Sequence, residues 1–152
     1  MTVPRERLIR QLTAEPRKPI VSVTAPPGYG KTVLLSQWVA REERDVAWLT
    51  LDDLDNDPSV FLTNVASSLD RVRPIDASMG AAIAVHGQRI LATAVPRVAW
   101  ELSRWEQPGL RVLEAVDQLT DRICLEALAQ LVDLLPPGFQ VAMAARADLD
   151  LP

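Results

Sequence analysis

The sequence of 152 residues has few residues of the types that build disulfides and metal clusters, with one cysteine and one histidine. Because Cys124 is alone, the chain can form neither an internal disulfide nor a cysteine zinc cluster. Because His86 is alone, a two-histidine site is excluded, and we expect His86 at the surface or at a helix cap. No run approaches the roughly 18 apolar residues of a membrane span. The charged start MTVPRERLIRQL lacks the apolar centre of a signal peptide. These absences favour a cytoplasmic protein with no membrane contact.

A surplus of basic residues is also missing. The 16 lysines and arginines are outnumbered by 20 aspartates and glutamates, which gives a formal net charge of -4. DNA-binding domains usually have a basic surplus, so we do not expect this segment to bind DNA by itself. The length and the 48% of hydrophobic residues are typical of one globular domain.

Strand-like and helix-like patterns alternate along the chain. Apolar and β-branched runs predict strands at residues 19–25, 45–52, 110–116 and 139–145. Apolar residues at helical spacing predict helices over 5–13, from Gly30, over 57–71, over 81–105 with an interruption at Pro96, and over 120–135 after a cap at Thr120 or Asp121. The alternation predicts an α/β protein with a mainly parallel sheet. In such sheets ligands bind beyond the carboxyl ends of the strands.

One turn at such an end, APPGYGKT at residues 25–32, concentrates glycine and proline. It follows the first predicted strand and precedes a predicted helix. It matches the phosphate-binding P-loop pattern G-x-x-x-x-G-K-[ST] at Gly30, Lys31 and Thr32, with Ala25 in place of the first glycine. By average composition, such a match arises by chance in a chain of this length on the order of one per cent of the time. The alternative is an ordinary turn with a solvated lysine.

The P-loop interpretation assigns a role to most positions of the turn. Backbone N–H groups of residues 28–33 would point into one concavity and bind phosphate oxygens at the start of the helix. Lys31 would reach the β- and γ-phosphates, and the hydroxyl of Thr32 would bind Mg²⁺. Pro27 has no N–H and lies before this cradle. Tyr29 either covers the phosphates or lies on the surface.

The third predicted strand offers a carboxylate for the metal. Glu114 stands where an aspartate is usual, and the open alternative is a strand carboxylate at an edge or partner contact. The next position normally holds the acid that activates water, but here it is Ala115. Asp117 is the candidate replacement, about 6–7 Å further along the strand. We expect loss of the base rather than its replacement, and therefore slow or absent hydrolysis. Arg146, after the fourth strand, would sense the γ-phosphate or be a surface arginine.

The remaining distinctive residues predict ordinary structure. We expect Trp38, Trp48, Trp100 and Trp105 to lie in the core. We expect the acidic loop at residues 52–57 to be a solvated turn, with a role near the nucleotide as the alternative.

Several stretches together resemble the nucleotide-binding domain of the MalT-like large ATP-binding LuxR-type bacterial regulators, a class of STAND P-loop NTPases. They are RERLIRQL, VSVTAPPGYGKTVLLSQW, RVLEAVDQLTD, LLPPGFQVAMAARADLDLP and, most specifically, VAWLTLDDLDNDPSVFLTNVASSL. The resemblance covers nearly the whole chain. It implies a three-layer α/β/α P-loop NTPase fold of the ASCE type. Residues 1–152 would be the N-terminal part of a single domain, truncated after the sensor strand. We therefore expect either an excised piece or a shortened gene product.

The resemblance implies an ATP/ADP switch with Mg²⁺ in a transcriptional regulator. Its partners would be nucleotide, further copies or other domains of the parent regulator, and DNA only through a C-terminal module. The implied nucleotide contacts are Pro27, Gly28, Tyr29, Gly30, Lys31, Thr32 and Val33, with Val3 and Arg5 near the base. Thr32 and Glu114 would hold the metal, and the catalytic or sensor positions would be Glu114, Asp117 and Arg146. The alternatives are an active ATPase or phosphotransferase domain, and a degenerate module that binds no nucleotide.

Overall fold

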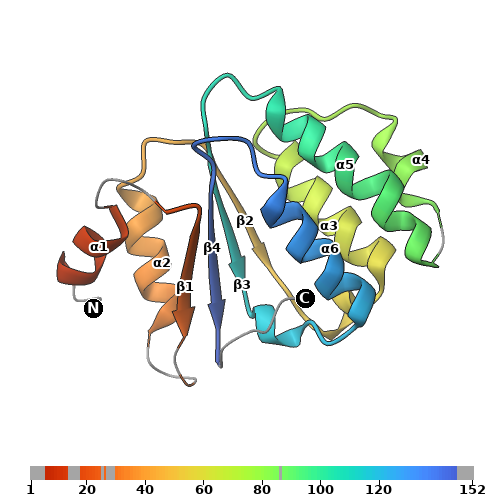
Figure 1. Cartoon of the computed structure of the whole chain (residues 1–152). Coiled ribbons are helices and arrows are strands. Elements are labelled where there is room, and N and C mark those ends of the chain that lie inside the picture. The colour runs from red at the N-terminus through yellow and green to blue at the C-terminus, as the bar shows by residue number, and fades with distance from the viewer. Residues whose placement is uncertain (1–5, 14–17, 25, 27–29, 86, 147–152) are drawn as a thin grey trace.

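The computed structural model of the chain describes residues 6–13, 18–24, 26, 30–85 and 87–146. Within them, parallel strands form one sheet in the order β1-β4-β3-β2, with helices on both faces (Figure 1). The strands are β1 (Ile20–Thr24), β2 (Val46–Thr50), β3 (Leu110–Glu114) and β4 (Gln140–Ala145). The α-helices are α1 (Glu6–Thr13), α2 (Lys31–Ala40), α3 (Pro58–Asp70), α4 (Met79–Ile83), α5 (Ile90–Ser103) and α6 (Arg122–Asp133). Short 3₁₀ helices are η1 (Asp53–Asn56), η2 (Gly87–Arg89) and η3 (Val116–Gln118). The predicted α/β architecture is confirmed, and the all-parallel sheet is compatible with a P-loop-like fold.

The alternation of side chains along the strands separates the two faces of the sheet. On the first face, Leu110 and Val112 of β3 pack with Leu35 and Trp38 of α2. Leu113 points to the second face, which α3, α5 and α6 cover (Figure 1). Full burial of one large apolar side chain contributes about 1.5–3 kcal/mol. Apolar packing therefore fixes α2 over β3, and with it the start of α2 near the carboxyl end of the sheet.

The helices of the second face begin at the side chains that the sequence indicates. Asp57 accepts a hydrogen bond from the backbone N–H of Ser59 at 2.9 Å, and Pro58 occupies the first helical position of α3. Of the two candidate caps for α6, Asp121 is the one used, and it accepts a bond from the N–H of Cys124 at 3.0 Å.

Two expected boundaries are wrong. β3 ends at Glu114 rather than at Val116, because Ala115 adopts a left-handed conformation with φ 58°. Pro96 does not interrupt a helix, because α5 continues through it and the break falls earlier, between α4 and η2. Proline inside a helix costs about 3 kcal/mol. The buried apolar side chains on both sides of Pro96 offset that cost.

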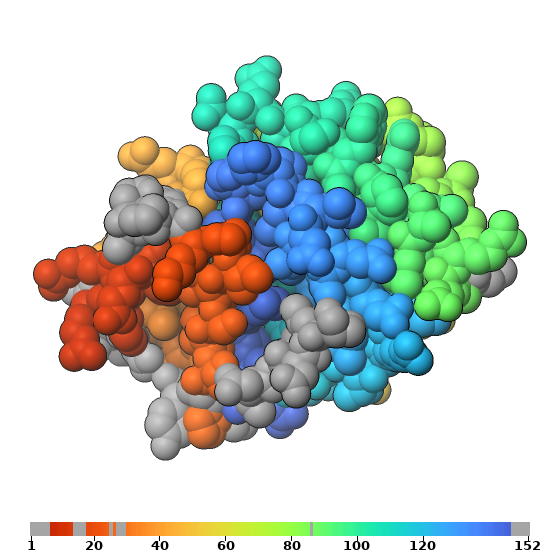
Figure 2. All heavy atoms as spheres, viewed as in Figure 1, coloured from red at the N-terminus to blue at the C-terminus, as the bar shows by residue number. Residues whose placement is uncertain are grey.

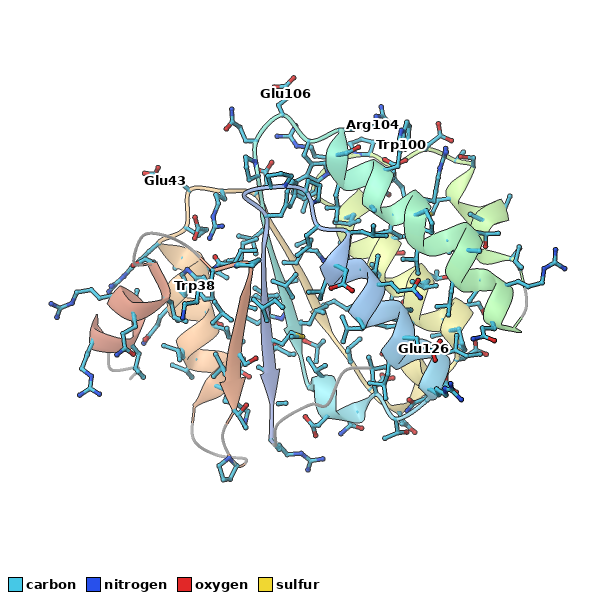
Figure 3. The ribbon with its side chains drawn as sticks, in the orientation of Figure 1. Trp38, Glu43, Trp100, Arg104, Glu106 and Glu126 are labelled. Carbon is cyan, nitrogen blue, oxygen red and sulfur yellow. The ribbon has the colours of Figure 1, made fainter. Side chains whose placement is uncertain are left out.

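The tryptophans are only partly in the core. Trp38 is fully buried and Trp105 nearly so, as expected. Trp100 is 44% exposed, which corrects the core prediction for this residue. Its ring lies 4.5 Å from the guanidinium of Arg97 and 4.9 Å from that of Arg104. Trp100, on α5, and Arg104, the C-cap of that helix, lie near each other at the opposite end of the sheet from the strand arrowheads (Figure 3).

β1 lies at one edge of the described sheet. Its side chains on the second face, Ile20, Ser22 and Thr24, are exposed. The strand is visible on the surface, in orange, beside the blue segments of β4 and α6 (Figure 2). Among the described helices, none is long and apolar enough to span a membrane.

Candidate functional site

The glycine turn leads into α2 through a left-handed residue. Gly30 has φ 78°, a conformation that glycine adopts without steric cost, and its carbonyl accepts the N–H of Leu34 at 2.9 Å. The helix therefore begins at Lys31, as the P-loop pattern requires. The remaining predicted contacts, Pro27, Gly28, Tyr29, Val3 and Arg5, lie outside the described residues, as does Ala25.

The first turn of α2 lies at the carboxyl end of the sheet (Figure 1). Lys31 is half-buried and its Nζ donates to the carbonyl of Pro26 at 3.3 Å. Thr32 and Val33 are exposed. The N–H groups at the start of a helix give this region a partial positive charge that attracts anions.

The carboxylate of Glu114 lies at the centre of a group of neutral hydrogen-bond donors. Its Oε2 accepts from the hydroxyl of Thr32 at 2.6 Å. Its Oε1 accepts from the indole N–H of Trp48 at 2.6 Å and from the hydroxyl of Thr50 at 3.1 Å. The structure thus brings together the two residues predicted to hold the metal, Thr32 and Glu114, although they are 82 positions apart in the sequence.

Strand register explains this convergence. In the parallel pair of β2 and β3, Thr50 stands opposite Glu114 and Trp48 stands opposite Val112. Because side chains alternate, Trp48, Thr50 and Glu114 all point to the first face, where α2 begins. Trp48 and Thr50 are site residues that the sequence patterns did not predict. The alternation in VAWLT, combined with pairing of the second and third strands, is the signal that could have found them.

This arrangement offers a hydroxyl and a carboxylate oxygen to a cation. The described part of the chain has no group of three or more histidine, cysteine, aspartate or glutamate side chains placed to hold a metal. Such a sparse set suits Mg²⁺ in phosphate sites, where the ion keeps several waters and takes other ligands from phosphates. Thr32 and Glu114 are therefore the described residues that fit a Mg²⁺–nucleotide complex.

The position after Glu114 takes the chain out of the strand. Ala115 is the one non-glycine residue with positive φ among those described, a conformation that costs about 1–2 kcal/mol. The following residues form η3, where the N–H of Gln118 donates to the carbonyl of Ala115 at 2.9 Å. Asp117 therefore lies in a 3₁₀ turn, which corrects the expectation that it continues the strand.

Asp117 is paired with the predicted sensor arginine. Arg146 follows β4 directly, as expected, and its Nε donates to Oδ2 of Asp117 at 2.9 Å. The backbone N–H of Arg146 donates to Oδ1 at 3.2 Å. Partial burial by itself raises the pKa of Asp117, but the hydrogen bonds and charge of Arg146 outweigh it and the pKa lies below its ordinary value. The aspartate is therefore an ionised partner of the arginine.

The acidic loop at residues 52–57 is less solvated than expected. Asp55 is 2% exposed, and its carboxylate accepts from the side-chain amide of Asn64 at 2.8 Å and the N–H of Asp52 at 2.9 Å. Burial of a paired carboxylate needs such donors. The prediction of a solvated turn is therefore wrong for Asp55, whereas Asp53 and Leu54 are exposed.

The same loop is bonded to the segment that joins η3 to α6. The carbonyl oxygen of the Asn56 side chain accepts the N–H groups of Thr120 at 2.7 Å and Asp121 at 2.9 Å. Its amide donates to the backbone carbonyl of Gln118 at 2.8 Å.

The buried Cys124 thiol donates to the carbonyl of Asp55 at 3.2 Å. Burial, followed by the nearby aspartates, raises the pKa of this thiol to about 12, so it is not a reactive thiolate at neutral pH.

Comparison with known proteins supports the family resemblance seen in the sequence. No family model matches the chain. The chain is similar to the HTH-type transcriptional regulator MalT of Yersinia enterocolitica, with 29% identity over 146 residues, and to that of Serratia proteamaculans, with 28% over 146 residues. Each match covers 95% of this chain, and the chain spans 16% of the length of these curated relatives. The resemblance to MalT-like large ATP-binding LuxR-type regulators is thereby confirmed as homology to MalT over nearly the whole chain.

Proposed function

We propose that the chain is an ATP/ADP-binding regulatory segment of a LuxR-type transcriptional regulator, with Mg²⁺ as cofactor and with slow or absent hydrolysis. Residues 1–152 then form the N-terminal part of one P-loop NTPase domain, of the ASCE and STAND type. The phosphates would lie against the turn before α2 and the start of that helix.

The observation that supports the proposal best is the hydrogen bond of 2.6 Å between the hydroxyl of Thr32 and the carboxylate of Glu114. A P-loop NTPase needs its Ser or Thr hydroxyl and its metal-side carboxylate at one point, since both bind the same Mg²⁺ or its waters. An ordinary strand-to-helix turn has no such requirement. The bound Mg²⁺ would supply charge neutralisation for the β- and γ-phosphates.

Slow or absent hydrolysis is supported by the residues after Glu114. Ala115 has no group that accepts a proton from water. Asp117 is ionised, but its two oxygens accept hydrogen bonds from Arg146. An acceptor already engaged by an arginine is a weak general base for a second donor. The site is therefore better suited to distinguishing ATP from ADP than to rapid turnover.

The regulatory role rests on the relatives. MalT of both organisms is named as an HTH-type transcriptional regulator. Because this chain matches 16% of their length, the DNA-binding module and the inducer site would lie in other parts of a parent protein. Self-association and contacts with those parts are the partners that we propose, in the cytoplasm.

Titration calorimetry of ATP and ADP into the wild-type chain and into Lys31→Ala, with and without Mg²⁺, tests the proposal. We expect binding by the wild type and a loss of about 100-fold or more in Lys31→Ala, because the lysine contacts phosphates and not the core. The melting temperature without nucleotide should stay close to that of the wild type. A large fall in that temperature would assign Lys31 a structural role instead.

Phosphate release measured on the wild type and on Asp117→Ala separates the switch from the ATPase alternative. Slow release that persists in Asp117→Ala agrees with the switch. Rapid release that collapses in Asp117→Ala would identify an active ATPase with Asp117 as its base. A folded wild type that ignores both nucleotides would identify a module that does not bind them.

A further inference from the structure

We infer that Trp48 and Thr50 are positioning residues that set the magnesium dependence of nucleotide binding by holding the carboxylate of Glu114 in place. The inference rests on the proposed function and goes beyond it, because it assigns a role to two residues of β2 that would touch neither nucleotide nor metal.

Glu114 is longer than the acid usual at this position. P-loop NTPases usually have an aspartate at the metal position, and Glu114 has one more rotatable bond. A longer side chain loses more conformational freedom when it is held in one place. Without other contacts, Glu114 would be a poorly defined ligand for a metal-bound water.

The three hydrogen bonds of Glu114 are divided between its two carboxylate oxygens. Trp48 and Thr50 both donate to Oε1, at 2.6 and 3.1 Å, whereas Thr32 donates to Oε2 at 2.6 Å. The donors from β2 thus direct Oε2 towards the start of α2. All three donors are neutral, so none of them forms an ion pair with the carboxylate.

The two donors on β2 are held rigidly. The indole of Trp48 is half-buried and packs against the first-face cluster that contains Leu35, Trp38 and Val112. Thr50 is β-branched and stands directly opposite Glu114 in the strand pair. Glu114 is therefore held by groups whose own positions are fixed by the sheet.

The same cluster contains a matched control. Trp38 is also a tryptophan of the first face, but its indole N–H has no hydrogen-bond partner among the described residues. Trp38→Phe and Trp48→Phe therefore remove similar volumes from one cluster, and only the second removes a bond to Glu114.

The test measures ADP affinity by calorimetry in excess Mg²⁺ and in EDTA, and the ratio of the two is the magnesium factor. We expect Trp48→Phe to lower this factor about fivefold to tenfold, which is less than the full effect of losing a hydrogen bond to a charged group because Thr50 still holds Glu114, with an unchanged affinity in EDTA. Thr50→Val should lower it about threefold, because its bond is longer. Trp38→Phe should leave it unchanged.

A double-mutant cycle distinguishes positioning from a structural effect. Because Trp48 acts through Glu114, Trp48→Phe should not change the magnesium factor further once Glu114→Gln is present. If Trp48→Phe does not fold, Thr50→Val in the same cycle gives the same distinction.

The outcomes separate this inference from the proposed function. A wild type that binds no nucleotide overturns both. A wild type that binds ADP equally well in Mg²⁺ and in EDTA overturns the inference and leaves nucleotide binding intact. An unchanged factor in Trp48→Phe and Thr50→Val, or an equal loss with and without Mg²⁺, also overturns it.

Discussion

Glu114 and Asp117 are three positions apart in the sequence, yet their carboxylates have different kinds of partner. Glu114, at the end of β3, accepts hydrogen bonds from two hydroxyls and an indole. Asp117, in the 3₁₀ turn η3, accepts both of its hydrogen bonds from Arg146. The carboxylate of Glu114 therefore has only neutral hydrogen-bond donors among the described residues, whereas the carboxylate of Asp117 forms an ion pair with Arg146.

The difference shows how the conformation of one residue can give two acids that are close in the sequence different positions and partners. Had β3 continued past Glu114, Asp117 would extend beyond it along the strand. The left-handed Ala115 ends the strand and turns Asp117 towards the end of β4. Glu114 thus suits cation binding, and Asp117 suits the placement of Arg146.

Of the variants that compare the two acids, the one that removes the carboxylate of Glu114 should have the largest effect on nucleotide binding. Glu114→Gln should lower ADP affinity in Mg²⁺ about 10- to 30-fold, or about 1.4–2 kcal/mol, and should leave the affinity in EDTA unchanged. The fold should persist, because the amide oxygen still accepts from Trp48 and Thr50. Asp117→Asn is the matched control and should keep the dependence on Mg²⁺. Equal effects of the two variants in calorimetry would contradict the division of the site.

Asn56→Ala tests whether the hydrogen bonds of Asn56 hold the acidic loop against the segment that follows Asp117. The substitution leaves the N–H groups of Thr120 and Asp121 without their acceptor, so we expect a loss of about 1–3 kcal/mol in the free energy of unfolding. Urea unfolding measures it. Asp53→Ala, at an exposed position of the same loop, should change that free energy by less than about 0.5 kcal/mol. If Asn56→Ala were equally neutral, the bonds of Asn56 would not be what holds the two loops together.

Ala115→Gly tests the residue that separates the two acids. Glycine relieves a left-handed strain of about 1–2 kcal/mol but loses more entropy on folding, so we expect a net stabilisation of about 0.5 kcal/mol. The same substitution at Ala92, exposed on α5, should destabilise by about 1 kcal/mol because that position is helical. Thermal unfolding of the two variants should therefore shift in opposite directions. A lower melting temperature for Ala115→Gly would mean that Ala115 is not strained.

Asp117→Asn should have the smallest effect on stability. The partner Arg146 is largely exposed, so the ion pair contributes about 0.5 kcal/mol after solvent screening. Because the folded pKa of Asp117 lies below its ordinary value, this contribution is present above about pH 4 and is lost as the pH falls through the folded pKa. Unfolding of wild type and variant should thus differ slightly at pH 7 and converge at low pH. A difference that grew on acidification would contradict the pairing.

The sequence predicts the elements well where local patterns decide them. Strands and helices follow from apolar periodicity, and the start of α3 follows from Asp57 and Pro58. The convergence of Thr32 and Glu114 also follows from a pattern, since the P-loop motif and the third strand imply a common end of the sheet.

The errors fall where tertiary contacts decide. The left-handed angle of Ala115 is not indicated by its residue type, because alanine usually adopts helical or extended angles. The role of Trp48 depends on which strand pairs with β2, and an apolar pattern cannot distinguish an indole that packs from one that also donates. The burial of Asp55 depends on Asn64, nine residues further on in α3.

The central claim is that Thr32 and Glu114 form the metal side of a nucleotide site, and paramagnetic NMR tests it most directly. ADP would be titrated into the chain with Mn²⁺ in place of Mg²⁺, and the indole N–H signals of the tryptophans would be followed. The account predicts that the signal of Trp48, whose N–H is bonded to Glu114, broadens strongly, while that of Trp100 at the other end of the sheet stays sharp. A sharp Trp48 signal at saturating Mn²⁺ and ADP would contradict it.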